Sequence, residues 1–225
     1  KVIAGLHDDT GRITVPGFYD GVPDLSNELA ASWDDLKFDA EAFLGEVGLK
    51  LPAGEQGRRP LEMIWSRPTC EVNGMTAGYT GDGFKTVLPA EARAKISFRL
   101  VGQQDPHAIR ESFRKMVTDM IPADCRVEFH SHGASAAGQM STTHPAFAQA
   151  RHALSDEWPQ AAAYVGCGGS IPSAAYFKQY LDMDAMLIGF GKDDDQIHSP
   201  NEKYDLSSFH KGTRSWARIL HAMTA

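Results

Sequence analysis

The order of the elements predicted between residues 61 and 133 constrains the fold of this chain more than any other feature. Residues 61–75 read as strand, turn and strand, and residues 85–101 alternate apolar and polar side chains as a strand does. An amphipathic helix follows at 106–121, and residues 125–133 alternate again. This β-β-α-β order predicts an antiparallel α+β unit that ends near residue 134.

The pattern changes after residue 134. Helices are predicted at 145–158 and 201–223, and a fully apolar run at 185–190 reads as a buried strand of a parallel or mixed α/β sheet. The chain therefore divides into two predicted units, 1–134 and 135–225. The second is too small for a complete α/β domain. Because residues 2–8 read as the end of a helix, we expect the sequence to be the C-terminal part of a longer polypeptide.

Charge and composition exclude some partners. The formal net charge is -7, and both nucleic acids and anionic membranes call for a cationic surface, so neither is an expected partner. No apolar stretch approaches the roughly 20 residues of a membrane helix. The three cysteines, Cys70, Cys125 and Cys167, lack a CxxC spacing. They predict reduced thiols and a cytoplasmic location.

A glycine-rich turn before a helix suggests an anion site. Gly168 and Gly169 permit close backbone approach, Ser170 suits the helix cap, and Pro172 suits the first turn. Free N–H groups at such a helix start bind carboxylates or phosphates. The alternative is an ordinary capped helix.

The stretch "GKDDDQIHSPNEKYDLSS" places His198 just past the apolar run, where α/β folds carry ligands. Neutral imidazole is a normal zinc ligand, and Glu202 or one of the aspartates 193–195 can orient it. The alternative is a solvated loop histidine. A metal here needs ligands from elsewhere, and the pair His130 and His132 is a weaker candidate.

Two further side chains are candidates for chemistry. Arg99 alternates with the apolar face of its strand, and an arginine held there can clamp a carboxylate with two hydrogen bonds. The alternative is a surface arginine. Cys167 beside the glycines permits a nucleophile with His198 as its base, but the sequence shows no third group to orient that base.

Three stretches in register resemble the carnosinase-type dipeptidases. They are "SRPTCEVNGMTAGYTGDGFKTVLPAEARAKISFRLVGQQDP", "GGSIP" and "IHSPNEKYDL". These dipeptidases belong to the zinc exopeptidase family that includes aminoacylase, carboxypeptidase G and succinyl-diaminopimelate desuccinylase. The resemblance implies an α+β lid with a ferredoxin-like antiparallel sheet and helices on one face (1–134). It also implies the C-terminal part of an α/β catalytic domain (135–225).

The resemblance also implies roles for particular residues. His198 would be a zinc ligand. Ser170 and Gly169 would bind the substrate carboxylate, and Arg99 would bind substrate from the lid. Thr86 would reach the active site of a partner subunit. Two zinc ions per subunit are implied, with manganese or cobalt as alternatives, together with a homodimer formed through the lid. The substrate would be a small peptide or an N-acyl amino acid.

Several motifs of that family have no counterpart in this sequence. They are an N-terminal His-x-Asp, a bridging aspartate, a Glu-Glu pair that supplies the general base, a further aspartate, and a His-Ser-Gly segment. Cys167 also stands where an acidic residue often precedes the two glycines, so the resemblance leaves the substrate preference open. We therefore expect the isolated chain to be inactive. The alternatives are a non-catalytic dimerisation module and a carboxylate-binding fragment that works without metal.

Overall fold

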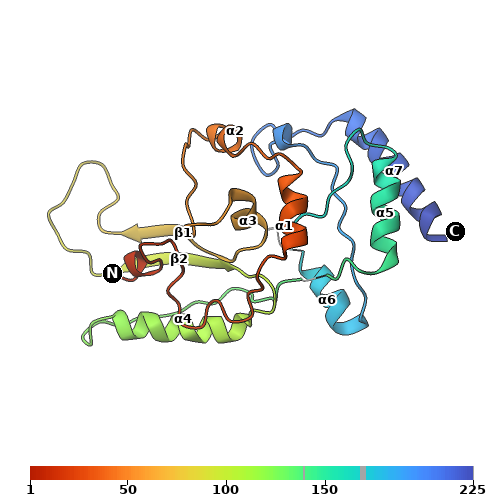
Figure 1. The fold of residues 1–225 in the computed structure, drawn as a ribbon. Coiled ribbons are helices and arrows are strands. Elements are labelled where there is room, and N and C mark those ends of the chain that lie inside the picture. Colours follow the sequence, from red (N-terminus) through yellow and green to blue (C-terminus); the bar gives the residue numbers. More distant parts are fainter. Residues whose placement is uncertain (139, 168–170, 225) are drawn as a thin grey trace. The chain divides into compact units, whose positions relative to one another are not determined.

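The computed structural model describes residues 1–138, 140–167 and 171–224 and divides into two compact units (Figure 1). Unit 1 comprises residues 1–139 and 166–172, and unit 2 comprises 140–165 and 173–225. In the described parts of the chain, no helix is both long and apolar enough to cross a membrane. The elements are η1 (Ile3–Gly5), α1 (Asn27–Asp34), α2 (Ala40–Gly45), α3 (Pro60–Trp65), β1 (Thr69–Ala77), β2 (Ala92–Arg99), α4 (Pro106–Met120), α5 (Pro145–Ser155), α6 (Pro172–Leu181), η2 (Asp193–Asp195) and α7 (Leu206–Thr224).

Local capping explains where the helices of unit 1 begin. Ser26 Oγ accepts the N–H of Leu29 at the start of α1 (3.2 Å). Asp105 Oδ1 accepts the N–H of His107 (2.8 Å) and of Ala108 (3.2 Å) at the start of α4, whose first residue is a proline. These bonds satisfy N–H groups that have no partner within the helix. The predicted helix after residue 105 is confirmed.

Strands β1 and β2 form an antiparallel pair whose register runs from Thr69 opposite Arg99 to Ala77 opposite Ala92. The register shifts by one residue between Val72 and Gly74, as a bulge does. Residues 78–91 form the long connection that projects beyond the two strands in Figure 1. The α+β class is thus confirmed, with a sheet of two strands among the described residues.

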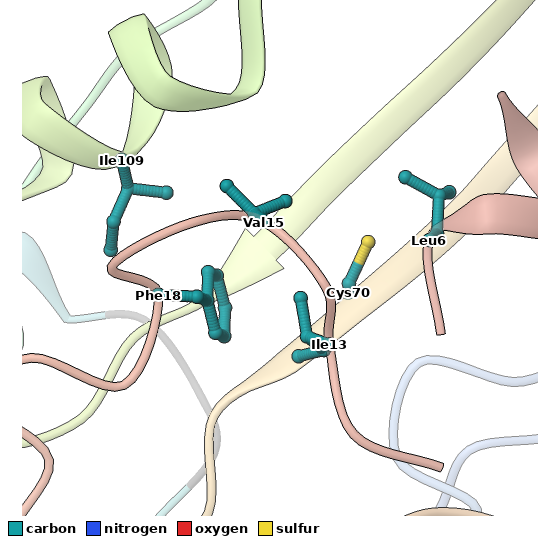
Figure 2. Packing of buried hydrophobic residues seen from close by; sticks show 6 residues of the cluster. All are labelled: Leu6, Ile13, Val15, Phe18, Cys70 and Ile109. Atoms are coloured by element: carbon teal, nitrogen blue, oxygen red, sulfur yellow. The ribbon is translucent and has the colours of Figure 1, made fainter. Parts of the chain in front are cut away.

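The core of unit 1 joins the N-terminal segment to the sheet and α4 (Figure 2). Phe18 lies at its centre, with its ring centroid 5.5 Å from that of Phe98, which lies 5.3 Å from that of Phe113 on α4. Aromatic rings at these separations pack edge-to-face or tilted and bury large apolar surfaces. The buried members are Leu6, Ile13, Val15, Phe18, Cys70 and Ile109.

A buried ion pair lies next to this core. Glu55 and Arg67 are each only 8% exposed, and the guanidinium of Arg67 donates to both carboxylate oxygens, with Nη2 3.0 Å from Oε1. The guanidinium of Arg12 lies 4.0 Å from the centroid of the Tyr19 ring and also reaches Glu55 (3.5 Å). Because Arg67 lies two residues before β1, this cluster ties the N-terminal segment to the sheet.

Three predicted strands are wrong. The region predicted to begin with a strand at residue 61 starts as α3, whose first position is Pro60. Residues 125–133 lie along α4, where Arg110 donates to the carbonyls of His132 (3.2 Å) and Gly133 (3.1 Å). Residues 185–191 form no strand, although Met186 and Ile188 pack on the core of unit 2. A strand requires a neighbouring strand for its backbone hydrogen bonds, and alternation alone does not supply one.

Unit 2 is built on α5 and α7, which pack against each other through Ala150, Ala153 and Ile219. The rings of Phe190 and Trp158 stack with centroids 5.7 Å apart. Phe190 also contacts α7 so closely that a Cβ at Gly212 would lie 2.9 Å from its ring. The small residues of α7 therefore let aromatic side chains approach its backbone.

A buried hydroxyl on α7 allows a stability test. Ser208 is 1% exposed, and its Oγ has no hydrogen-bond partner among the described residues. We expect Ser208→Ala to raise the free energy of unfolding by about 1 kcal/mol, because it removes an unsatisfied polar atom. Ser215→Ala is the control, since Ser215 Oγ accepts from Trp158 Nε1 (2.9 Å) and its loss should destabilise by about 1–3 kcal/mol. Equal effects of both changes in urea unfolding would contradict this account.

Thiol reactivity tests the core of unit 1. Cys70 is 4% exposed, and burial raises the pKa of its thiol to about 11, whereas Cys125 and Cys167 are exposed. Because the thiolate is the reactive form, we expect two thiols of the native protein to react rapidly with a disulfide reagent at about pH 8. The third should react only on unfolding. Three equally fast thiols would show that Cys70 is not buried.

Candidate functional site

His198 lies in a loop of unit 2 between η2 and α7. The backbone of this loop takes the left-handed conformation at Gln196 (φ 52°), His198 (φ 62°) and Asn201 (φ 64°). A non-glycine residue in this region costs roughly 1–2 kcal/mol, so surrounding contacts must hold three of them in place.

Hydrogen bonds within the loop supply part of that support. The N–H of Ser199 donates to the carbonyl of Gln196 (2.9 Å), and the N–H of Glu202 donates to the carbonyl of Ser199 (3.3 Å). The carboxylate of Glu202 accepts the backbone N–H of His198 (3.3 Å). Glu202 therefore orients His198 through the backbone of His198, and His198 remains exposed.

A cluster of two lysines and three aspartates closes the loop, and we refer to it as the lysine–aspartate cluster. Asp195 is 1% exposed, and its Oδ2 accepts the N–H of Lys192 (2.8 Å). Lys203 Nζ lies 3.2 Å from Asp195 Oδ1 and 2.9 Å from Asp194 Oδ2. Asp205, just before α7, contacts both lysines.

The contacts in this cluster favour the charged forms of its members. The hydrogen bond from the N–H of Lys192, and next the ammonium of Lys203, hold the pKa of Asp195 below its ordinary value. The carboxylates of Asp194 and Asp195 raise the pKa of Lys203. The cluster thus remains ionised near neutral pH and keeps the two ends of the loop together.

The candidate substrate residues of unit 1 lie on and beside the sheet. Arg99 is the last residue of β2, pairs with Thr69 in the register and is exposed, whereas Phe98 and Leu100 pack on the core. The alternation predicted for this strand is confirmed, and it directs Arg99 away from the core. Thr86 is exposed in the connection between β1 and β2.

The predicted anion site cannot be placed in the same way. Gly168, Gly169 and Ser170 lie outside the described residues, and α6 begins shortly after them. Gly166, just before them, packs on α3: a Cβ there would lie 2.2 Å from the carbonyl oxygen of Trp65. Only a residue without a side chain fits so close to that backbone.

Side chains that could bind a metal are scattered over the described parts of the chain. Within residues 1–138, 140–167 and 171–224, no three His, Cys, Asp or Glu side chains gather closely enough to hold a metal ion. His130 and His132 are exposed, and His132 contacts Arg110 through its carbonyl. His198 stands as a single imidazole on a fixed loop.

Comparison with known families decides what kind of protein carries this loop. Residues 17–222 match the profile of Peptidase family M20/M25/M40, which is nearly the whole chain. The chain belongs to this family. The match includes the His198 loop, both strands and the segment around the two glycines.

Curated relatives of the chain are named as dipeptidases. A Cys-Gly metallodipeptidase from Candida albicans is 28% identical over 98% of this chain and 46% of its own length. The human Beta-Ala-His dipeptidase is 25% identical over 99% of this chain and 44% of its own length. The chain therefore spans about half the length of the relatives that it matches.

Solved M20 structures share the fold. An M20 family metallo-carboxypeptidase from Sulfolobus solfataricus has a TM-score of 0.84 at 27% identity, over 97% of this chain and 50% of that one. Human carnosine dipeptidase 1 has a TM-score of 0.80 at 23% identity, over 99% and 48% of the two chains. The resemblance inferred from the sequence motifs is confirmed.

Sequence reasoning misses the part of the loop that holds His198. It names Glu202 or one of the aspartates 193–195 as the group that orients the imidazole; Glu202 contacts His198 through the backbone N–H, whereas Asp195 turns inward to Lys192 and Lys203. The available signal is the alternation of lysines with aspartates on either side of the histidine, at 192–195 and 203–205. Such runs are usually solvated, so the sequence alone does not distinguish a buried aspartate from an exposed one.

Proposed function

We propose that these residues form the C-terminal part of an M20 metallopeptidase, a dipeptidase-like hydrolase of small peptides or N-acyl amino acids. The family match over residues 17–222 carries this proposal. It agrees with relatives that are named for dipeptide substrates, Cys-Gly and Beta-Ala-His.

His198 is the metal ligand that this chain contributes. Its donor chemistry fits zinc, since a neutral imidazole is among the usual ligands of that ion, and manganese or cobalt are alternatives. The loop supports the assignment because it fixes the backbone of His198 by a bond to Glu202 and leaves the residue exposed. When bound, a divalent metal supplies Lewis-acid polarisation of the scissile carbonyl and lowers the pKa of water.

The substrate is held by its carboxylate. Arg99, exposed at the end of β2, offers a planar fork of donors that suits a carboxylate. By resemblance, Ser170 and Gly169 are assigned to the same group, and Thr86 reaches the active site of a partner subunit. Recognition of a free carboxylate would restrict cleavage to the end of a peptide.

Residues 1–134 act as a lid and residues 135–225 as the end of the catalytic domain. The lid forms a homodimer in the cytoplasm, and two metal ions bind per subunit. The general base and the remaining ligands come from family motifs that this sequence lacks. The isolated 225-residue chain is therefore inactive.

One observation favours a non-catalytic dimerisation role as the second candidate. The connection between β1 and β2 exposes large apolar side chains, with Phe84 at 87% and Leu88 at 96%. Such residues commonly mark contacts with another protein. The two candidates coexist if a dimeric enzyme contains this chain.

The test is hydrolysis of Cys-Gly by the intact natural polypeptide that contains this sequence. We expect turnover that a chelator abolishes and that added Zn²⁺, Mn²⁺ or Co²⁺ restores. A Cys-Gly derivative with an amidated C-terminus is the control, and it should react much more slowly. Hydrolysis that is indifferent to chelator would contradict the proposal.

A further inference from the structure

The left-handed residues of the His198 loop need an external support. Gln196, His198 and Asn201 have positive φ although none is glycine. Such conformations persist when neighbouring contacts determine them. The bonds from Ser199 to Gln196 and from Glu202 to Ser199 lie inside the loop and do not join its two ends.

Asp195 and Lys203 supply the contact between the two ends. The carbonyl of Asp195 accepts the N–H of Lys203 (3.0 Å), and its carboxylate lies 3.2 Å from the ammonium of Lys203. All three left-handed residues lie between these two positions. A backbone bond and an ion pair thus close the same segment.

Burial separates Asp195 from the other acids of the lysine–aspartate cluster. The side chain of Asp195 is 2% exposed, whereas that of Asp194 is 71% exposed, although both contact Lys203. A contact made away from water is screened less and fixes geometry better than an exposed one. Asp194 is therefore the natural control for Asp195.

We propose that Asp195 and Lys203 are positioning residues that hold the 196–202 loop in the conformation that presents His198. The connection is short, because Glu202, which accepts the N–H of His198, directly precedes Lys203. A ligand that is already oriented loses less conformational entropy when it binds its ion. The metal part of this inference rests on the proposed function, whereas the conformational part does not.

The experiment is amide hydrogen exchange, followed by NMR on the 225-residue chain. The N–H groups of His198, Ser199, Glu202 and Lys203 each donate within the loop and report on its closure. We expect their protection to fall at least about tenfold in Asp195→Ala and in Lys203→Met, with Ile219 of the core unchanged. Positive-φ backbone shifts of the loop should be lost as well.

Two variants separate positioning from a general loss of structure. Lys203→Arg keeps the cation and should retain the protection, and Asp194→Ala should leave it within about twofold of wild type. If Asp195→Ala fails to fold, the comparison of Lys203→Met with Lys203→Arg tests the proposal instead. The Lys203 side chain is 43% exposed, so changes there are expected to leave the fold intact. Lys203→Arg losing as much protection as Lys203→Met would overturn the role of the cation.

Other results also overturn the proposal. They are no protection of the loop in wild type, unchanged protection in both Asp195→Ala and Lys203→Met, and a loss of protection at the Ile219 N–H of these variants as large as the loss in the loop. Metal retention in a His198→Ala variant of the intact polypeptide is measured separately. If the loop loosens as expected but His198→Ala keeps its metal, the positioning stands and the proposed function fails. If His198→Ala loses metal but the loop keeps its protection in Asp195→Ala and Lys203→Met, the proposed function stands and the positioning role fails.

Discussion

Arg67→Met is expected to lower the free energy of unfolding by about 3–5 kcal/mol, because it leaves the carboxylate of Glu55 buried without its partner. Arg67 contacts both carboxylate oxygens of Glu55, and both residues are 8% exposed. The more distant Arg12, 3.5 Å from Glu55, is partly exposed and compensates weakly. Urea unfolding followed by tryptophan fluorescence measures the change.

An exposed pair in the same unit provides the control. Arg93 and Glu91 lie 3.1 Å apart with side chains 81% and 75% exposed, so Arg93→Met should change stability by no more than about 0.5 kcal/mol. Similar losses in the two variants would contradict the burial of the Glu55–Arg67 pair.

The pH dependence gives an independent check of the same pair. Burial opposes the charged form of Glu55, but the hydrogen bonds from Arg67 and Tyr19, together with the charges of Arg67 and Arg12, outweigh it and lower the pKa of Glu55 below its ordinary 4.5. The pair therefore contributes stability in full above about pH 4.5, and this contribution is lost as pH falls through the lowered pKa. Because Glu55 without its cation binds a proton more readily in the folded variant, the gap in stability between wild type and Arg67→Met should narrow steadily on acidification.

His198→Ala is expected to have the largest effect on activity. In the intact natural polypeptide, we expect Cys-Gly hydrolysis to fall by more than the roughly 10–100-fold typical of residues that only support a metal ligand. The reason is direct loss of a ligand, which weakens metal binding and the polarisation that the metal supplies. Steady-state rates at saturating and limiting substrate measure the loss.

A second histidine of the same unit is the matched control. His152 is exposed on α5, and His152→Ala should leave the rate within about twofold of wild type, as most surface changes do. A His198→Ala enzyme as active as His152→Ala would contradict the assignment. Exogenous imidazole that restores part of the lost rate would support it.

Local chemistry makes much of this fold predictable. Asp105 followed by a proline is a local signal for the start of the helix predicted at 106–121, because caps act within three residues of the chain. The alternation that ends in Phe98, Arg99 and Leu100 predicts β2 and the outward direction of Arg99. The family is likewise predictable, because the motif that contains His198 and the two other motifs are short runs of consecutive residues.

Distant contacts decide the rest. Residues 125–133 alternate as a strand does, yet they form no strand, and arginines of α4 hold them beside that helix. The local pattern predicts Trp65 in a strand, but this residue ends α3, and its ring packs 5.1 Å from that of Trp33. The ion pair of Glu55 with Arg67 and the inward turn of Asp195 also depend on partners that local patterns do not reveal.

The most direct test of the central claim, that His198 is a metal ligand of an M20 peptidase, is the metal content of the intact natural polypeptide. Mass spectrometry of the purified protein would give zinc, manganese and cobalt per chain for wild type, His152→Ala and His198→Ala. We predict about two ions per chain in the first two proteins and at least one ion fewer in His198→Ala. Equal metal content in all three would contradict the account.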